Sequence, residues 1–563
     1  MAGHKDAIVE CVPNFSEGRD MNIIRQITDT IEKTEGVRLL DVDPGRATNR
    51  TVVTFVGHPD AVIDAAYMAI KKAAELIDMS KHKGEHPRMG ATDVCPLIPV
   101  SGITLEETAG YAVKLAERVG KSLEIPVYLY EAAASKPERK NLANIRAGEY
   151  EGFENKIRQA EWAPDFGPSA FNKKAGATVI GARDFLVAYN VNLNTKSVRR
   201  ANSVAFDVRE NGRVKTDPTT GKPVTDHNGE VLRIPGSCKS VKAIGWYIEE
   251  YGIAQISMNL TDIHTTPLHI AFDACCKSAE ARGLRVTGSE LVGLVPKSVL
   301  TEAGKYFLKK QRRSVGVDES ELIHIAVRTL GLDELSPFDP KKKVIEYLLE
   351  ENENRPLVQK SLVAFANETA SESPAPGGGS ISAYVGALGV SLGTMVANLS
   401  AHKVGWDDRI DYFSDIAERG QILKERLLKL VDDDTDAFNQ IMAVFQMPKS
   451  TDVEKAARKS AMHTATIGAI EVPLEVMKAS LESLSLLREM AEKGNPNSVS
   501  DAGVGALCAR TAAEGAALNV RINCSGFDDK DFVAGATVRA EEMLMKAREV
   551  EREIITLVEK LIL

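Results

Sequence analysis

The sequence has no Cys-x-x-Cys pair among its seven cysteines. Only Cys275 and Cys276 lie close together, and neighbouring cysteines rarely bridge each other. This spacing indicates neither a zinc ribbon nor a disulfide framework. We therefore expect scattered reduced thiols in a cytoplasmic protein.

An excess of basic charge is also missing. The formal net charge is -9 and the sequence pI is about 5.8. Because nucleic-acid-binding domains usually carry a basic face, we expect no nucleic-acid partner. Any anion-binding site must therefore be formed by a few basic residues that lie close together.

The N-terminal residues contain no long apolar region, so no secretory signal is expected. Residues 381–399 carry no charge and are nearly long enough to span a membrane. They are rich in Gly, Ala and Ser, which insert weakly compared with Leu and Phe. We expect a closely packed helix of a soluble protein there, and no integral membrane span.

The first half of the chain alternates strand and helix patterns. Apolar and β-branched runs predict strands at 7–12, 37–42, 51–56, 92–100 and 126–130, and apolar periodicity predicts helices at 23–31, 61–77 and 104–119. The order begins β-α-β-β-α-β, as in ferredoxin-like folds. It recurs with strands at 185–193, 243–247, 254–260 and 284–294, and helices at 197–209 and 268–281. We expect two related α+β subdomains with a cleft between them, and a hairpin excursion at 210–240.

The second half shows helical patterns only. They cover 380–400, 410–446, 451–494, 500–519 and 533–562, which predicts an all-α helical bundle. The predicted division is two subdomains at 1–185 and 186–349, a charged linker at 350–357, and the bundle domain at 358–563.

The stretch KHKGEHPRMGATDVCPLIPV, residues 81–100, places His82, Lys83, Glu85, His86 and Arg88 close together before an apolar run. The His82-x-x-x-His86 spacing is that of a zinc pair, but Lys83 and the helix-disfavouring Pro87 argue against one. A solvated loop is one interpretation. The functional one is a general acid/base histidine beside cationic groups that hold an anionic substrate.

Three further loops carry candidate residues. PNFSEGR (13–19) and DVDPGR (41–46) each follow a predicted strand, and Asp41 and Asp43 share one face. Carboxylates are also common in turns, which is the alternative. The Gly- and Pro-rich segment 162–183 is either a ligand-binding lid or a linker.

Two features stand out in the helical half. SPAPGGGSISA precedes a helix, so its N–H groups can bind an anion, or Ser380 can simply cap the helix. Asp434 falls in phase with an apolar stripe made of Leu427, Val431, Phe438, Ile441 and Phe445. Asp432, Asp433 and Asp436 fall off it. A buried carboxylate costs several kcal/mol, roughly, so Asp434 is either a general acid/base or paired with another helix.

Several motifs carry a family resemblance. They are ECVPNFSEGRD, LLDVDPGRATNRTVVTFVG, HKGEHPRMGATDVCPLIPV, IRAGEYE, WAPDFGPSAF, SPAPGGGS and LVDDDTDAF. Together they resemble the formimidoyltransferase-cyclodeaminase family over nearly the whole chain. The 210–240 excursion and Asn172-Lys173-Lys174 depart from the family pattern.

The resemblance implies two folate reactions of histidine degradation. The formimino group of N-formimino-L-glutamate moves to N5 of tetrahydrofolate, and the product cyclises to 5,10-methenyltetrahydrofolate with release of ammonia. Carried over by motif, His86 is the implied catalytic residue of the transfer and Asp434 that of the cyclisation. The implied folate loop is Gly167, Pro168, Ser169, Ala170, Phe171, Asn172, Lys173, Lys174, Ala175 and Gly176.

The chemistry assigns further roles. Arg88, Arg46 or Arg50 is expected to bind substrate carboxylates, and Asp41 or Asp43 the cationic amidinium. Tetrahydrofolate, including its polyglutamated form, is the expected cosubstrate, with no metal and no redox cofactor. The family resemblance implies a homo-oligomer with sites completed by dimer contacts.

Two other classes stay open. One is a folate-binding or cytoskeletal scaffold with an inactive second site, which the presence of both His86 and Asp434 disfavours. The other is an ATP-using enzyme with a nucleotide site at 377–380, which the lack of a following Lys-Ser/Thr disfavours.

Overall fold

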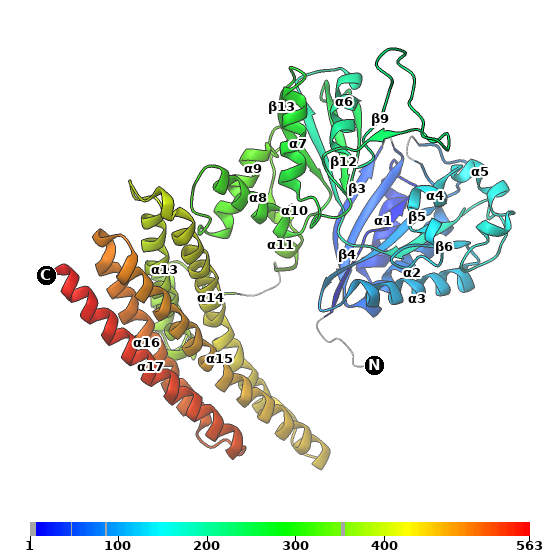
Figure 1. The fold of residues 1–563 in the computed structure, drawn as a ribbon. Coiled ribbons are helices and arrows are strands. Elements are labelled where there is room, and N and C mark those ends of the chain that lie inside the picture. Colours follow the sequence, from blue (N-terminus) through cyan, green and yellow to red (C-terminus); the bar gives the residue numbers. More distant parts are fainter. Residues whose placement is uncertain (1–6, 47, 85–86, 351–354) are drawn as a thin grey trace. The chain divides into compact units, whose positions relative to one another are not determined.

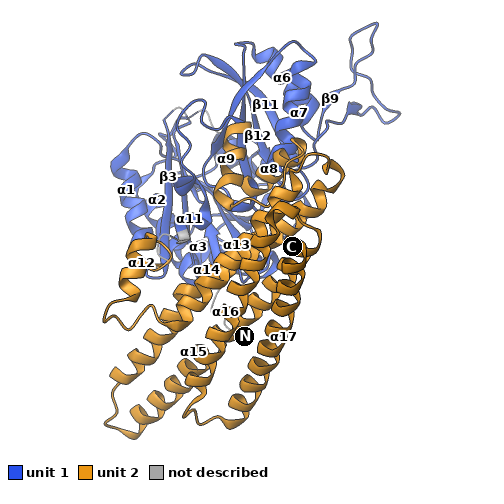
Figure 2. Ribbon diagram, turned by 90° about the vertical axis from the view of Figure 1, so that its left-hand side faces the viewer, with its two compact units in different colours: residues 1–299, 330–350 blue, residues 300–329, 351–563 orange. Residues whose placement is uncertain are grey.

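A computed structural model describes residues 7–46, 48–84, 87–350 and 355–563. The chain divides into two compact units (Figure 2). Unit 1 comprises residues 1–299 and 330–350, and unit 2 comprises residues 300–329 and 351–563.

A seven-stranded sheet forms the first part of unit 1 (Figure 1). Its strands are β1 (Ile8–Cys11), β2 (Asn14–Phe15), β3 (Val37–Gly45), β4 (Arg50–Gly57), β5 (Thr92–Ser101), β6 (Val127–Glu131) and β7 (Thr178–Ala182). β1 and β2 form one interrupted line, because both pair antiparallel with β4 and with β5. β3 lies beyond β4, and β7 and then β6 follow β5 in parallel.

Different helices pack on the two faces of this sheet. On one face, α1 (Met21–Glu32), α2 (Pro59–Leu76) and α3 (Leu105–Leu123) share a core with Val9, Phe55 and Leu97. Side chains alternate along a strand, so Glu10 points to the opposite face. There α4 (Leu142–Arg146) and α5 (Glu149–Lys156) cover the β6 and β7 side through a smaller core.

The second part of unit 1 is an antiparallel sheet of order β11-β12-β8-β13. Its elements are β8 (Val187–Leu193), α6 (Val198–Val208), β11 (Val241–Ile248), β12 (Ile253–Leu260), α7 (Leu268–Glu280) and β13 (Val286–Val292). The predicted excursion at 210–240 is a hairpin of β9 (Arg213–Val214) and β10 (Arg233–Ile234). α10 (Pro340–Lys343) and α11 (Ile345–Glu350) complete unit 1.

Each strand and helix predicted in unit 1 is present, but the interpretation of 162–183 as a loop is wrong at its end. Residues Thr178–Ala182 form β7, and all five are buried. A strand buried on both faces shows no polar alternation, so its short apolar run resembles a loop segment.

Unit 2 contains the five predicted helices, as Figure 1 shows. They are α13 (Gly378–Ala401), α14 (Ile410–Gln446), α15 (Asp452–Lys493), α16 (Val499–Cys524) and α17 (Lys530–Ile562), preceded by α12 (Leu362–Thr369). Among the described residues, α13 alone is long and apolar enough to cross a membrane, and most of its apolar stretch is buried inside the bundle.

Residues 300–329 pack with the bundle, although the sequence places them in the stretch 186–349. They include most of α8 (Lys297–Lys310) and of α9 (Glu319–Leu330). The Gly316 carbonyl accepts hydrogen bonds from Asn398 (2.8 Å) and Gln421 (3.0 Å), and the Val315 N–H donates to Ser414. The two sheets of unit 1 and the helical C-terminal region give the chain a three-domain architecture.

Candidate active sites

Arg88 anchors the loop that follows α2. Its side chain is buried, and each of its five N–H groups has an acceptor. Nε donates to His82 Nδ1 (3.2 Å), and the terminal nitrogens donate to Glu151 (2.6 and 2.9 Å), Glu149 (3.1 Å) and the His82 carbonyl (3.3 Å). Arg88, predicted to bind a substrate carboxylate, therefore has no donor left for one in this structure. His86, the predicted acid/base, lies outside the described residues.

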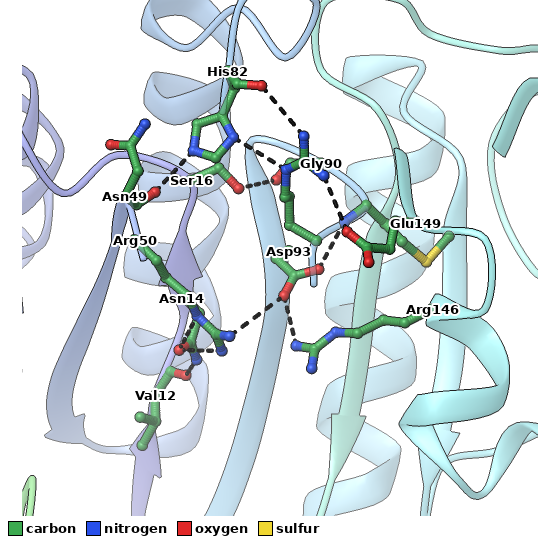
Figure 3. A network of polar contacts seen from close by, with 12 residues as sticks. Val12, Asn14, Ser16, Asn49, Arg50, His82, Gly90, Asp93, Arg146 and Glu149 are labelled. Carbon is green, nitrogen blue, oxygen red and sulfur yellow. Dashed lines mark hydrogen bonds and ion pairs between the residues drawn. The ribbon is translucent and has the colours of Figure 1, made fainter. Parts of the chain in front are cut away.

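His82 is held between two neighbours (Figure 3). Because a guanidinium only donates, Nδ1 accepts from Arg88, and Nε2–H donates to the Asn49 carbonyl (2.8 Å). Burial lowers the pKa of His82, which favours the neutral ring. The Asn49 side chain in turn bonds Gly18 N–H (3.0 Å) and the Lys83 carbonyl (3.0 Å). His82 therefore has a positioning role in this loop.

A second network surrounds Asp93, which is fully buried (Figure 3). Its carboxylate accepts hydrogen bonds from Met89 N–H (3.0 Å) and from Arg146 (2.6 Å). Arg50 lies 4.0 Å away and donates to Asn14 (2.6 and 2.9 Å). Burial lowers the pKa of Arg50 to about 10. The network holds the Arg146 guanidinium in a defined orientation.

The predicted cleft between the two parts of unit 1 is present, with a volume of about 800 Å³. Pro87, Arg146 and Glu149 line it from the first part. Lys242 and Asp262 line it from the second. The cleft contains charges of both signs, which suits a substrate that carries both.

The predicted folate loop is exposed at its start and buried at its end. Gly167, Pro168, Ser169 and Ala170 are exposed, as are Lys173 and Lys174, and Ala175 and Gly176 are buried. Phe171 packs on Tyr150 with ring centroids 5.4 Å apart, and the Asn172 side chain accepts from Ala175 N–H (2.9 Å). Gly176, at φ +70°, bridges to Gly90. The structure therefore places the end of this loop beside the Arg88 segment.

The acidic residues of β3 lie elsewhere. Asp41 is half-buried, and burial raises its pKa while the charge of Lys343 opposes that rise. Asp43 and Arg46 are exposed. None of the hydrogen bonds seen among described residues joins these three side chains to the His82 or Asp93 networks.

Unit 2 has a separate site at the start of α13. The Asp434 carboxylate accepts from the Ser380 N–H (2.8 Å) and hydroxyl (3.0 Å), both at Oδ2. Burial raises the pKa of Asp434, and the two Ser380 bonds oppose that rise. A Cβ added at Gly379 would lie 2.1 Å from Oδ1, so only glycine lets the carboxylate approach this closely.

Three expectations about this site are corrected. Ser380 does not cap α13, since Gly377 is the N-cap residue; the helix start instead binds the Asp434 carboxylate. Asp432 was predicted to lie off the buried face, yet it is 4% exposed and accepts from Leu357 and Val358 N–H groups. An incoming chain segment covers that side of α14, which periodicity within the helix cannot reveal. Phe438 and Phe445, predicted to be buried, are 36% and 57% exposed.

Sequence reasoning missed Arg146, Asp93 and the Ser380–Asp434 contact. Arg146 lies in the motif IRAGEYE, which offered a signal, whereas a lone Asp before an apolar strand offered none. Within the described ranges, no group of three or more His, Cys, Asp or Glu side chains is placed to hold a metal ion.

These features define an enzyme with two candidate sites, one in a charged α/β cleft and one around a partly buried carboxyl in a helical bundle. Family models match along the chain: "Formiminotransferase domain, N-terminal subdomain" at 8–183, "Formiminotransferase domain" at 188–350 and "Formiminotransferase-cyclodeaminase" at 361–542.

The relatives of the chain agree with this division. The chain is 42% identical over 555 residues to the formimidoyltransferase-cyclodeaminase of Gallus gallus, covering 98% of this chain and 99% of the relative. It is 40% identical over 302 residues to a glutamate formimidoyltransferase of Streptococcus pyogenes serotype M1 (54% and 93%). It is 35% identical over 195 residues to a methenyltetrahydrofolate cyclohydrolase of Methylorubrum extorquens (35% and 94%). The chain belongs to the formimidoyltransferase-cyclodeaminase family and is a bifunctional enzyme.

Proposed function

We propose that unit 1 transfers the formimino group of N-formimino-L-glutamate to N5 of tetrahydrofolate, releasing glutamate. Unit 2 then cyclises 5-formiminotetrahydrofolate to 5,10-methenyltetrahydrofolate, releasing ammonia. Tetrahydrofolate, also as polyglutamate, is the cosubstrate. The names of the relatives of each part support these assignments. A role in histidine degradation is part of the same proposal.

The proposed cyclisation rests on the surroundings of the Asp434 carboxyl. Both Ser380 donors bind Oδ2, and no hydrogen bond to Oδ1 is present among the described residues. N10 of the folate attacks the formimino carbon, and ammonia must leave with an added proton. A carboxyl whose pKa is raised by burial can take the proton from N10 and deliver one to the departing nitrogen.

For the transfer, His86 takes the proton from N5 and returns one to the leaving glutamate nitrogen. General acid/base catalysis of this kind typically contributes about 10²–10⁴-fold. This assignment rests on the Glu-His-Pro-Arg-Met-Gly motif. Among the cations of the cleft, Arg146 is best placed to bind a substrate carboxylate, because Asp93 already orients its guanidinium. Arg46 and the carboxylate of Asp41 remain proposed substrate contacts.

Further proposals concern the setting of the sites. Residues 167–176 form the folate loop, and both parts of unit 1 are ferredoxin-like, a class that the order β8-α6-β11-β12-α7-β13 supports. The domains divide at 185, 349 and 357. The enzyme is a cytoplasmic homo-oligomer with sites completed by dimer contacts, in which the free cysteines remain reduced.

The test uses the full chain with formiminoglutamate and tetrahydrofolate, and follows methenyl absorbance and ammonia. His86→Ala should abolish transfer and leave cyclisation of added 5-formiminotetrahydrofolate. Asp434→Asn should do the reverse. Asp436→Asn, on the exposed side of α14, is the matched control. Full cyclisation by Asp434→Asn would refute the proposed role of that carboxyl.

A further inference from the structure

A cavity of unit 2, of about 850 Å³, lies where α14 ends, α15 begins and α16 ends. Its cationic lining is Lys449, Lys455, Arg458 and Lys459. Its apolar lining includes Ile441, Phe445, Met462, Ile522 and Phe527. We call this cavity the basic pocket.

The cations of the basic pocket are only partly neutralised. Arg458 donates to the Val444 and Phe445 carbonyls (3.1 and 3.3 Å), so its charge is held in place. Lys455 pairs with Asp452 (3.0 Å), and both are exposed. Within the described part of the chain, neither Lys449 nor Lys459 has a carboxylate within salt-bridge distance.

Acidic groups near the basic pocket are fewer. Asp528 lies in its lining, and Asp529 is engaged by His463 (3.4 Å) and by the Phe532 N–H (3.0 Å). The pocket therefore keeps an excess of positive charge above an apolar floor, which suits an anion joined to an aromatic or apolar group.

The basic pocket lies on the same side of α14 as Asp434. Asp434, Phe438, Ile441 and Phe445 follow each other at steps of three or four residues, which is one helix face. Ile441 is about 10 Å along the helix from Asp434, and Phe445 about 16 Å. Phe438 lies between them and is partly exposed.

The helix α16 also passes both the Asp434 site and the basic pocket. A Cβ at Gly378, one residue before Gly379, would meet the Asn519 side chain at 3.5 Å. One turn further along α16, Ile522 and Asn523 line the basic pocket. The carboxyl site and the basic pocket are thus neighbours along both α14 and α16, at the same end of the bundle.

We propose that the basic pocket binds the glutamate carboxylates of the folate that is cyclised at Asp434. This rests on the function proposed above. The p-aminobenzoyl ring and its amide join the reacting nitrogens to the glutamate, and they lie along the apolar strip at Phe438. The pteridine end then lies at Asp434, and Lys449 and Lys459 face the carboxylates.

This binding is remote from the reacting carbon. It acts equally on substrate and transition state, so it lowers KM and leaves kcat unchanged. An exposed ion pair contributes up to about fivefold in affinity, so reversing both charges should raise KM about ten- to thirtyfold.

The test measures cyclisation by the full-length double variant Lys449→Glu, Lys459→Glu with added 5-formiminotetrahydrofolate. The same assay uses the analogue without glutamate, 5-formiminotetrahydropteroate. Lys429→Glu is the control, because Lys429 is an exposed residue of α14 outside the pocket. Unchanged cyclisation of the analogue reports that unit 2 of each variant is folded.

The expected result is a raised KM for the glutamate-bearing substrate alone, with kcat and the analogue's KM unchanged. An unchanged KM, or an equal rise for both substrates, overturns the inference and leaves the proposed function standing. If the wild-type enzyme does not cyclise 5-formiminotetrahydrofolate, the proposed function fails and this inference fails with it.

Discussion

Glu10→Gln should stabilise unit 1, and increasingly so as pH rises. Glu10 lies in the middle of β1 and is 4% exposed. Among the described residues, no donor forms a hydrogen bond with its carboxyl. Burial raises the pKa of Glu10 from 4.5 to about 7, with the charge of Arg183 opposing the rise and that of Glu346 adding to it. The folded state therefore favours the protonated, neutral form.

The sign and size of the expected stability change follow from this pKa shift. Because the pKa of Glu10 is raised in the folded state, the stability that the protonated carboxyl contributes is fully present below pH 4.5. It is lost as the pH rises through about 7. At about 1.4 kcal/mol per pKa unit, the difference of 7 from 4.5 corresponds to about 3 kcal/mol. Glutamine has nearly the same shape and never ionises. The variant should therefore match the wild type near pH 4 and exceed it by about 3 kcal/mol near pH 8.

The assay is thermal unfolding of both proteins across pH 4–8, read from the transition of unit 1. For a unit of roughly 300 residues, 3 kcal/mol corresponds to a Tm increase of about 5 °C. Glu35→Gln, at an exposed position of the same unit, should show no such trend. A Tm difference that is the same at pH 5 and pH 8 would refute the reasoning, because it would mean that Glu10 ionises normally in the folded protein.

Two further substitutions test the sites directly. Gly379→Ala should lower cyclodeaminase activity at least about tenfold and leave transfer intact, because the new Cβ would displace the Asp434 carboxyl. Gly468→Ala is the control. No atom lies within 4 Å of a Cβ added there, so both activities should be unchanged. Equal activities of the two variants would show that the approach of Gly379 does not matter. Arg88→Lys should lower transferase activity and destabilise unit 1 by about 2–3 kcal/mol in urea unfolding, because lysine cannot make the two-pronged bond to Glu151. Arg158→Lys, in an exposed pair with Glu154, should change stability by less than about 0.5 kcal/mol, and a loss as small for Arg88→Lys would contradict the anchoring role.

Local pattern was enough for most of the fold. The apolar periodicity of 410–446 and 451–494 matches α14 and α15 to within a few residues, because a long amphipathic stripe has few alternative structures. β7 was missed for the opposite reason. A five-residue strand buried on both faces carries no period that distinguishes it from an apolar loop.

The sequence by itself determined the two-part organisation and the positions of most elements, and it predicted a role for Asp434. Only the tertiary structure decided what each polar group contacts. Arg88 was expected to bind substrate, but carboxylates 61 and 63 residues away take its donors. Ser380 bonds Asp434 from 54 positions away. Spacing within one element predicts which face a residue occupies, whereas a hydrogen bond depends on which distant segment folding brings to that face.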